Sequence, residues 1–235
     1  MSSAEDGAPE VEDAGQSRSN AIVTAGLFIV GIGLFVTGVL ADSAALRLVG
    51  KPIPVLALTS FAALQKKPYA RWIAGGLFLG AVGDVFLEIS KNLFVAGLVA
   101  FLLGHIAYVI AFFLDEKRLK PALLIPPLAL GGLVIWQLWP GLGALKVPVV
   151  VYMFVICAMA WRAAARLSMT RGDTVWALAG AVLFLISDST LGFHRFGGSF
   201  PGARAVILVT YWAAQMCIAL STHSGGVVRS RTFGG

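Results

Sequence analysis

Two aspartates stand inside long apolar stretches, where a charged group is costly. Asp84 lies in LFLGAVGDVFLEIS and Asp188 lies in GAVLFLISDSTLGF. A carboxylate at the centre of a bilayer costs at least about 2.5–3.5 kcal/mol on insertion scales, so such a residue is a functional candidate unless it only joins helices. Each aspartate follows a tryptophan near the start of its apolar run by twelve residues, Trp72 for the first and Trp176 for the second. Helices rising about 1.5 Å per residue would place both acids at one depth, and this predicts a shared pocket.

Helical periodicity predicts further polar side chains beside the two acids. Gly76 and Gly80 precede Asp84 at intervals of four residues, and Gly180 and Gly192 lie on the helix face of Asp188; small residues on a face allow helices to approach closely. Glu88 follows Asp84 by one turn and is expected at a hydrated helix end. A histidine among aromatic residues is more often a core residue than a chemical group, and a tyrosine–glutamine pair can simply join helices. The polar residues expected to line the pocket are His105, Tyr108, Tyr152, Ser187, Tyr211 and Gln215.

Other reaction classes lack the residues that they need. No G-x-S-x-G turn is present, so a serine hydrolase of that type is not supported. His105, His194 and His223 fall in separate regions, which argues against a zinc cluster, and no metal ion is expected. No glycine-rich phosphate-binding loop occurs either. With these classes set aside, the two intramembrane aspartates remain the functional candidates.

The composition shows that the elements positioning these residues lie in a membrane. Hydrophobic residues make up 58% of the 235 residues and charged residues only 13%, against averages of about 45–50% and 25% in soluble domains. Stretches close to the ~20 residues needed to cross a bilayer recur along the chain. The weakest are the second, which carries Arg47 and Lys51, and the fifth, which begins near two adjacent prolines. The sequence predicts an all-α bundle of eight transmembrane helices, at residues 21–40, 46–64, 72–88, 93–114, 121–139, 147–161, 175–193 and 203–221.

The loop charges predict an orientation for these eight helices. Twelve Lys and Arg residues fall on the side that holds both termini and six on the other, so both termini are expected in the cytoplasm. The net charge of +6 is therefore assigned to loops and lipid headgroups and not to a nucleic-acid partner. Residues 1–20 are expected to be a disordered acidic tail, residues 21–221 the membrane domain, and residues 222–235 a flexible tail. A bacterial plasma membrane is the expected location.

An ordered set of short motifs, running from about residue 25 to 221, resembles the YhhN-type lysoplasmalogenases. No single motif is specific, but their order and spacing are. Lys51–Pro52 also fits the pattern. The motifs are G-D-x-x-L at Gly83–Leu87, F-x-x-x-H-x-x-Y at Phe101–Tyr108, L-F-x-x-S-D-x-x-L at Leu183–Leu191 and Y-W-x-x-Q at Tyr211–Gln215.

The resemblance implies an integral membrane hydrolase that cleaves the vinyl ether bond of lysoplasmalogens. The products would be a fatty aldehyde and glycerophosphoethanolamine or glycerophosphocholine, and no cofactor is expected. The resemblance carries the catalytic role to Asp84 and Asp188. The chemistry agrees, because protonation of a vinyl ether on carbon gives an oxocarbenium ion that water traps, and paired carboxyl groups serve a similar ion in glycosidases.

The roles within the site follow from the neighbouring residues. Asp84 has the more apolar flanks, which favours it as the acid, while Asp188 lies beside Ser187 and would be the better-solvated carboxylate. Lys51, expected near the outer face, could meet the phosphate of a lysophospholipid, and the other partners would be membrane lipids.

Two other classes of function use similar residues. Buried aspartates also serve proton-coupled transporters, and the third and seventh spans share [GS]-D-x-x-L as a short repeat. A non-catalytic lipid-binding protein would use the same aspartates only to hold helices together. Aldehyde release by purified protein separates the enzyme from both alternatives.

Overall fold

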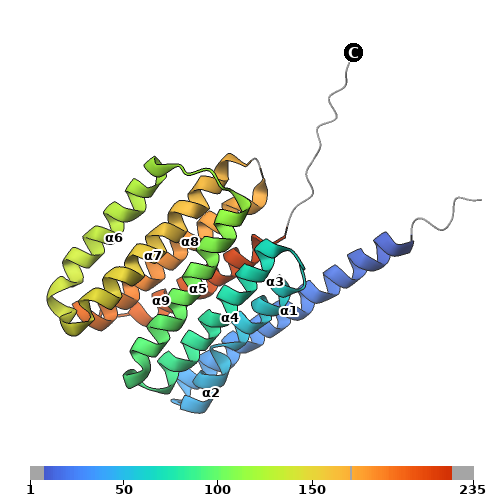
Figure 1. Ribbon diagram of the computed structural model, residues 1–235. Coiled ribbons are helices and arrows are strands. Elements are labelled where there is room, and N and C mark those ends of the chain that lie inside the picture. Colours follow the sequence, from blue (N-terminus) through green and yellow to red (C-terminus); the bar gives the residue numbers. More distant parts are fainter. Residues whose placement is uncertain (1–7, 170, 224–235) are drawn as a thin grey trace, which may run out of the picture.

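Eight helical segments in the described part of the chain are long and apolar enough to cross a membrane. The structure is a computed structural model that describes residues 8–169 and 171–223, and the described residues contain helices and no strands. The predicted eight-helix, all-α architecture is thereby confirmed (Figure 1). Its principal helices are α1 (Ala8–Leu40), α2 (Ala44–Gly50), α3 (Ile53–Ala63), α4 (Pro68–Ile89), α5 (Phe94–Asp115), α6 (Ile125–Leu138), α7 (Lys146–Ala165), α8 (Gly172–Gly192) and α9 (Ala203–Leu220).

The first two spans differ in detail from the sequence prediction. Helix α1 begins at Ala8, inside the segment expected to be a disordered tail. Extending an existing helix by further residues costs little free energy, because the helix is already nucleated. The second span is two helices, because Pro52 has no backbone N–H to continue α2. The break places Lys51 at the junction of α2 and α3.

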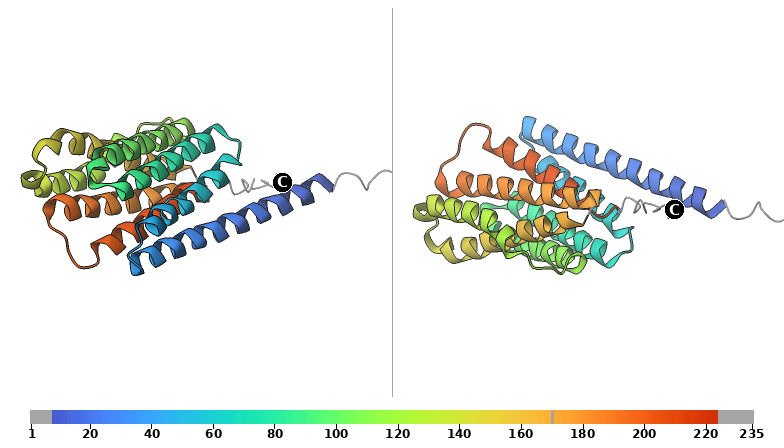
Figure 2. Two further views of the ribbon diagram at one scale, coloured as in Figure 1. Left: turned by 90° about the horizontal axis from the view of Figure 1, so that it is seen from below. Right: turned by 90° about the horizontal axis from the view of Figure 1, so that it is seen from above.

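Six helices form a closed ring. Helix α3 packs on α4, α4 on α5, α5 on α7, α7 on α8, α8 on α9, and α9 returns to α3. Helix α6 lies outside the ring against α7, while α1 covers α2 and α3 on the far edge (Figures 1 and 2). Polar side chains that point into this ring are thereby removed from lipid.

Glycines set the close contacts within the ring. A Cβ added at Gly104 would meet the backbone oxygen of Gly76 at 3.0 Å, and one at Gly180 would meet the backbone oxygen of Ala214 at 2.9 Å. A Cβ at Gly80 would lie 2.5 Å from Nε2 of Gln215. The packing role predicted for the glycines beside Asp84 and Asp188 agrees with these contacts of the α4–α5 and α8–α9 pairs, Gly104 being an addition from the structure, and Gly80 also leaves room for a polar side chain.

Two arginines that the sequence analysis placed in a loop are buried, at the end of the bundle away from the α2–α3 junction. Arg162 and Arg166 are 1% and 0% exposed, because α7 continues beyond residue 161 and carries them inward. The Nε of Arg166 donates to Asp115 of α5 at 2.9 Å, and its Nη1 donates to the hydroxyl of Tyr69 of α4 at 2.9 Å. Beyond the membrane span, hydrogen bonds to Asp173 raise the pKa of the Arg171 guanidinium. This network fastens the ends of α4, α5, α7 and α8 together.

Candidate active site

Asp84 is the acceptor at the end of a chain of directed hydrogen bonds. Its side chain is fully buried on α4, and the hydroxyl of Tyr211 on α9 donates to Oδ2 at 2.8 Å. Nε2 of Gln215 donates to the Tyr211 hydroxyl at 3.0 Å, and Tyr108 on α5 donates to Oε1 of Gln215 at 2.7 Å. Nζ of Lys51 lies 3.6 Å from Oδ1 of Asp84. Among the described residues, the hydrogen-bond and ion-pair partners of Asp84 are a donor and a cation, which suits the ionised carboxylate.

Asp188 has a different set of neighbours. The hydroxyl of Tyr152 on α7 donates to Oδ2 of Asp188 at 2.5 Å. Nε2 of His105 lies 3.8 Å from the same oxygen, beyond hydrogen-bonding distance. Both ring nitrogens of His105 are buried, and neither has a hydrogen-bond partner among the described residues. No lysine or arginine pairs with Asp188 among the described residues, in contrast to Asp84.

Aromatic rings connect the two acids across the ring of helices. Phe101 packs edge-on against Tyr211, with ring centroids 5.7 Å apart, and Phe184 packs against Tyr211 at 5.8 Å. Phe184 also contacts the ring of His105 at 4.9 Å. The two carboxyl groups therefore belong to one continuous set of contacts, with Phe101 and Phe184 between their immediate partners.

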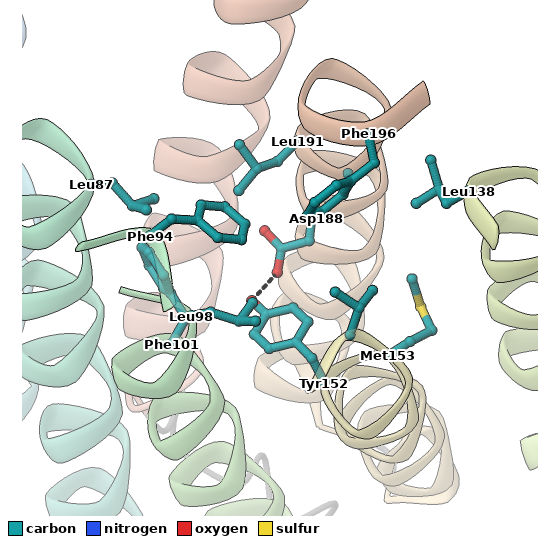
Figure 3. Close-up of a pocket in the computed structure, with 12 residues that line it drawn as sticks. Leu87, Phe94, Leu98, Phe101, Leu138, Tyr152, Met153, Asp188, Leu191 and Phe196 are labelled. Atoms are coloured by element: carbon teal, nitrogen blue, oxygen red, sulfur yellow. Dashed lines mark hydrogen bonds between the residues drawn. The ribbon is translucent and has the colours of Figure 1, made fainter. Parts of the chain in front are cut away.

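A small cavity opens beside Asp188. Its volume is about 40 Å³, enough for one water molecule and too small for a lipid chain. Figure 3 shows the Asp188 carboxylate with its dashed hydrogen bond to Tyr152, while Phe94 and Phe196 lie near the acid. The rings of Phe94 and Phe196 contact each other edge-on at 5.8 Å. Asp84 does not line this cavity. The two acids therefore share a network of contacts, but Asp188 alone of the two borders this cavity.

The structure brings together most of the residues singled out by sequence. Tyr211 and Tyr152 hydrogen-bond an acid directly and His105 lies near Asp188, while Gln215 and Tyr108 reach Asp84 through the hydrogen-bond chain that ends at Tyr211. The exceptions are described next.

Ser187 and Glu88 lie in environments that differ from the sequence interpretation. The hydroxyl of Ser187 donates to the backbone oxygen of Ile207 at 3.1 Å, which joins α8 to α9 and turns Ser187 away from the cavity. Glu88 is not a hydrated helix end, because its side chain is only 12% exposed and accepts from Nε of Arg47 at 3.0 Å.

Sequence reasoning missed the partners of Glu88. Arg47 on α2 and Arg204 on α9 both pair with it, together with Lys51. The spacing of four residues from Arg47 to Lys51, and again from Asp84 to Glu88, places each pair on one helix face and could have indicated this cluster.

Comparison with known proteins identifies the family. The model of the YhhN family matches residues 46–222. The chain belongs to the YhhN family. It is 40% identical to the human protein named lysoplasmalogenase TMEM86A over 164 residues, which cover 67% of this chain and 68% of the human one.

Further relatives of this YhhN-family protein come from distant organisms. The pig protein named lysoplasmalogenase TMEM86B is 36% identical over 177 residues, which cover 73% of each chain. A protein of Mycobacterium tuberculosis named lysoplasmalogenase is 35% identical over 168 residues, which cover 66% of this chain and 61% of the relative. No solved structure matches the chain.

Proposed function

We propose that this protein hydrolyses the vinyl ether bond of lysoplasmalogens, releasing a fatty aldehyde and glycerophosphoethanolamine or glycerophosphocholine. The observation that carries the proposal is the pair of aspartates inside the ring of helices, Asp84 buried on α4 and Asp188 partly buried on α8, each hydrogen-bonded by a tyrosine from a facing helix. Relatives that bear the name lysoplasmalogenase support the same substrate class. The protein acts within a membrane, and we place it in a bacterial plasma membrane.

Asp188 is assigned the proton-donating role, which reverses the assignment made from sequence flanks alone. Lys51 stands 3.6 Å from Asp84 and favours its carboxylate form, whereas no lysine or arginine in the described part of the chain pairs with Asp188. Asp188 also lines the cavity that can hold a water molecule. Acid and carboxylate are thus separated by their electrostatic surroundings, as in other paired-carboxyl sites.

The reaction follows from these roles. Asp188 gives its proton to the vinyl carbon remote from the ether oxygen, which leaves an oxocarbenium ion at the carbon bonded to oxygen. The carboxylate of Asp84 stabilises this cation. Asp188, now ionised, accepts a proton from the water that attacks the cation, and the hemiacetal so formed collapses to aldehyde and alcohol. Tyr152 and Tyr211 hold the two carboxyl groups in place.

Asparagine substitutions test the proposal. Asp84→Asn and Asp188→Asn are each expected to lower aldehyde release from lysoplasmalogen by roughly a thousandfold, since acid–base groups contribute about 10²–10⁴ in rate. The assay uses purified protein in detergent, with an ester lysophospholipid as the control substrate. Asp115→Asn, at the opposite end of α5, is the matched control and should retain activity per folded molecule. An active Asp188→Asn protein, or substrate flux in proteoliposomes with no new product, would contradict the proposal.

A further inference from the structure

Three cations from separate segments gather round one carboxylate at the end of the bundle that holds Asp84. Glu88 lies 3.0 Å from Nε of Arg47, 3.8 Å from Nζ of Lys51 and 3.7 Å from Nη2 of Arg204. These residues come from α2, from the α2–α3 junction and from the first turn of α9. The cluster therefore forms only when the three segments pack together on α4.

Arg204 is the least satisfied member of this cluster. Arg47 also pairs with Asp42 at 3.1 Å, and Lys51 also pairs with Asp84. Among the described residues, Arg204 has a single ion pair, at 3.7 Å from Glu88 and longer than a hydrogen bond, and its side chain is 53% exposed. Its guanidinium therefore keeps donors available for another anion, and an Arg is well suited to bind phosphate through two parallel hydrogen bonds.

An apolar groove runs from this cluster along the bundle. It has a volume of about 650 Å³, lies between α1 and α9, and is lined by apolar side chains apart from Arg204. Phe35 forms part of its wall, and the Arg204 guanidinium lies 5.7 Å from the centre of that ring. A charged group at one end of an apolar groove matches an amphiphile with an anionic head and a hydrocarbon chain.

We propose that Arg204, with Arg47 and Lys51, forms a phosphate subsite that binds the phosphodiester of the lysophospholipid substrate. This inference rests on the proposed function and extends it to the recognition of the headgroup. Lys51 bridges Glu88 and Asp84, and in a lysoplasmalogen only a glycerol unit separates the phosphate from the vinyl ether. A phosphate bound at the cluster would hold the vinyl ether close to Asp84. Glu88 is a positioning residue that keeps the three cations together before the phosphate binds.

Two substrates that differ only in the phosphate test this subsite. The first is lysoplasmalogen, and the second is 1-alkenylglycerol, which carries the same vinyl ether without a headgroup. The preference for the phosphorylated substrate is the KM for 1-alkenylglycerol divided by the KM for lysoplasmalogen. In Arg204→Gln this ratio is expected to fall roughly tenfold, because one charge-assisted hydrogen bond of about 1.4 kcal/mol is lost. The kcat for lysoplasmalogen should change little, and Arg204→Lys should restore part of the preference. Lys146→Gln, a cation at the start of α7 outside the cluster, is the matched control and should keep the wild-type ratio.

A binding measurement separates failure of this inference from failure of the proposed function. Ester lysophosphatidylcholine should bind the wild-type protein more tightly than monoacylglycerol, and Arg204→Gln should remove that difference, whether or not any aldehyde is formed. Glycerophosphocholine and inorganic phosphate should bind far more weakly than the lysolipid if the subsite recognises a lipid headgroup. An unchanged KM ratio in Arg204→Gln, equal binding of the two lipids by wild type, or equally tight binding of inorganic phosphate would overturn the subsite as a lipid-headgroup site.

Discussion

At the scale of single residues, the two aspartates differ in what their carboxyl groups face. Asp84 receives a tyrosine hydroxyl and lies beside an ammonium group, while Asp188 receives a tyrosine hydroxyl and borders a cavity. The sequence interpretation made Asp84 the acid because its flanking residues are apolar. Flanking residues do not reveal neighbours that come from other helices. Lys51 lies more than thirty residues away in sequence, and only the packing of the α2–α3 junction on α4 brings it to Asp84.

The tyrosines provide the first prediction. Tyr152→Phe removes the hydrogen-bond donor to Asp188. Because Asp188 becomes charged as it gives up its proton, and a hydrogen bond to a charged group contributes roughly 1.5–3 kcal/mol, kcat for aldehyde release should fall about 10- to 100-fold. Tyr69→Phe is the matched control, because Tyr69 bonds to Ser221 and Arg166 at the far end of the bundle. It should lower thermal stability and leave kcat per folded molecule near the wild-type value. Equal losses of kcat in both variants would argue against a role for Tyr152 at the site.

At the scale of helices, close packing determines how the polar groups meet. The sequence correctly predicted which helices carry the polar residues, because the 3.6-residue period places Asp84, His105, Tyr108, Tyr211 and Gln215 on inward faces. It could not predict the order of helices around the ring, since hydrophobic stretches of similar length do not specify their neighbours. The packing of α9 between α8 and α3 is what brings Tyr211 to Asp84.

A glycine pair on α4 tests this packing. In Gly80→Ala the new Cβ would lie 2.5 Å from Nε2 of Gln215 and 3.3 Å from the Tyr211 hydroxyl. The side-chain ends can shift, so the protein should fold, but the hydrogen bonds to Asp84 should be disturbed and kcat should fall roughly tenfold, as expected for about 1.4 kcal/mol. Gly75→Ala, where nothing lies within 4 Å of the new Cβ, should match the wild type. Wild-type activity in Gly80→Ala would show that the donor chain is not needed.

The arginine network at the opposite end provides a prediction about stability. Arg166→Met removes the 2.7 Å ion-pair partner of Asp115, which keeps Arg171 at 3.4 Å, so the loss of stability should lie below the cost of about 3–5 kcal/mol for a buried charge left without any partner. We expect a clearly lower thermal midpoint in detergent, measured by loss of the monodisperse peak on heating. Lys117→Met, an exposed cation near the same end, is the control. Equal midpoints for the two variants would contradict the assignment of Arg166 as a fastening residue.

At the scale of the whole molecule, the eight spans were predictable from hydropathy and the burial of some charges was not. Arg162 and Arg166 entered the loop-charge count, yet both are enclosed by protein. On the other side, Arg47, Lys51 and Arg204 pair with Glu88. A charge engaged in an internal ion pair contributes less to orientation than one that faces a headgroup, so the count needs correction for pairing. The remaining loop charges still predict that both termini lie in the cytoplasm.

Cysteine labelling tests this orientation. The native residues Cys157 and Cys217 are both buried, so an introduced cysteine should dominate the reaction with a membrane-impermeant maleimide. In intact bacterial cells, Lys91→Cys should be labelled and Lys66→Cys should be labelled only after permeabilisation, because the two positions lie at opposite ends of α4. The reverse pattern would invert the topology.

Protonation of the vinyl carbon by Asp188 is the central step of the proposed reaction, and it leaves a stable isotopic label in the product. Lysoplasmalogen hydrolysed by the purified protein in D₂O should give an aldehyde that carries one deuterium on the carbon next to the carbonyl, detected by mass spectrometry, and Asp188→Asn should give almost no aldehyde. Aldehyde without deuterium at that carbon would contradict protonation on carbon, and the same labelled product in equal amount from Asp188→Asn would contradict the role of Asp188 as the proton donor.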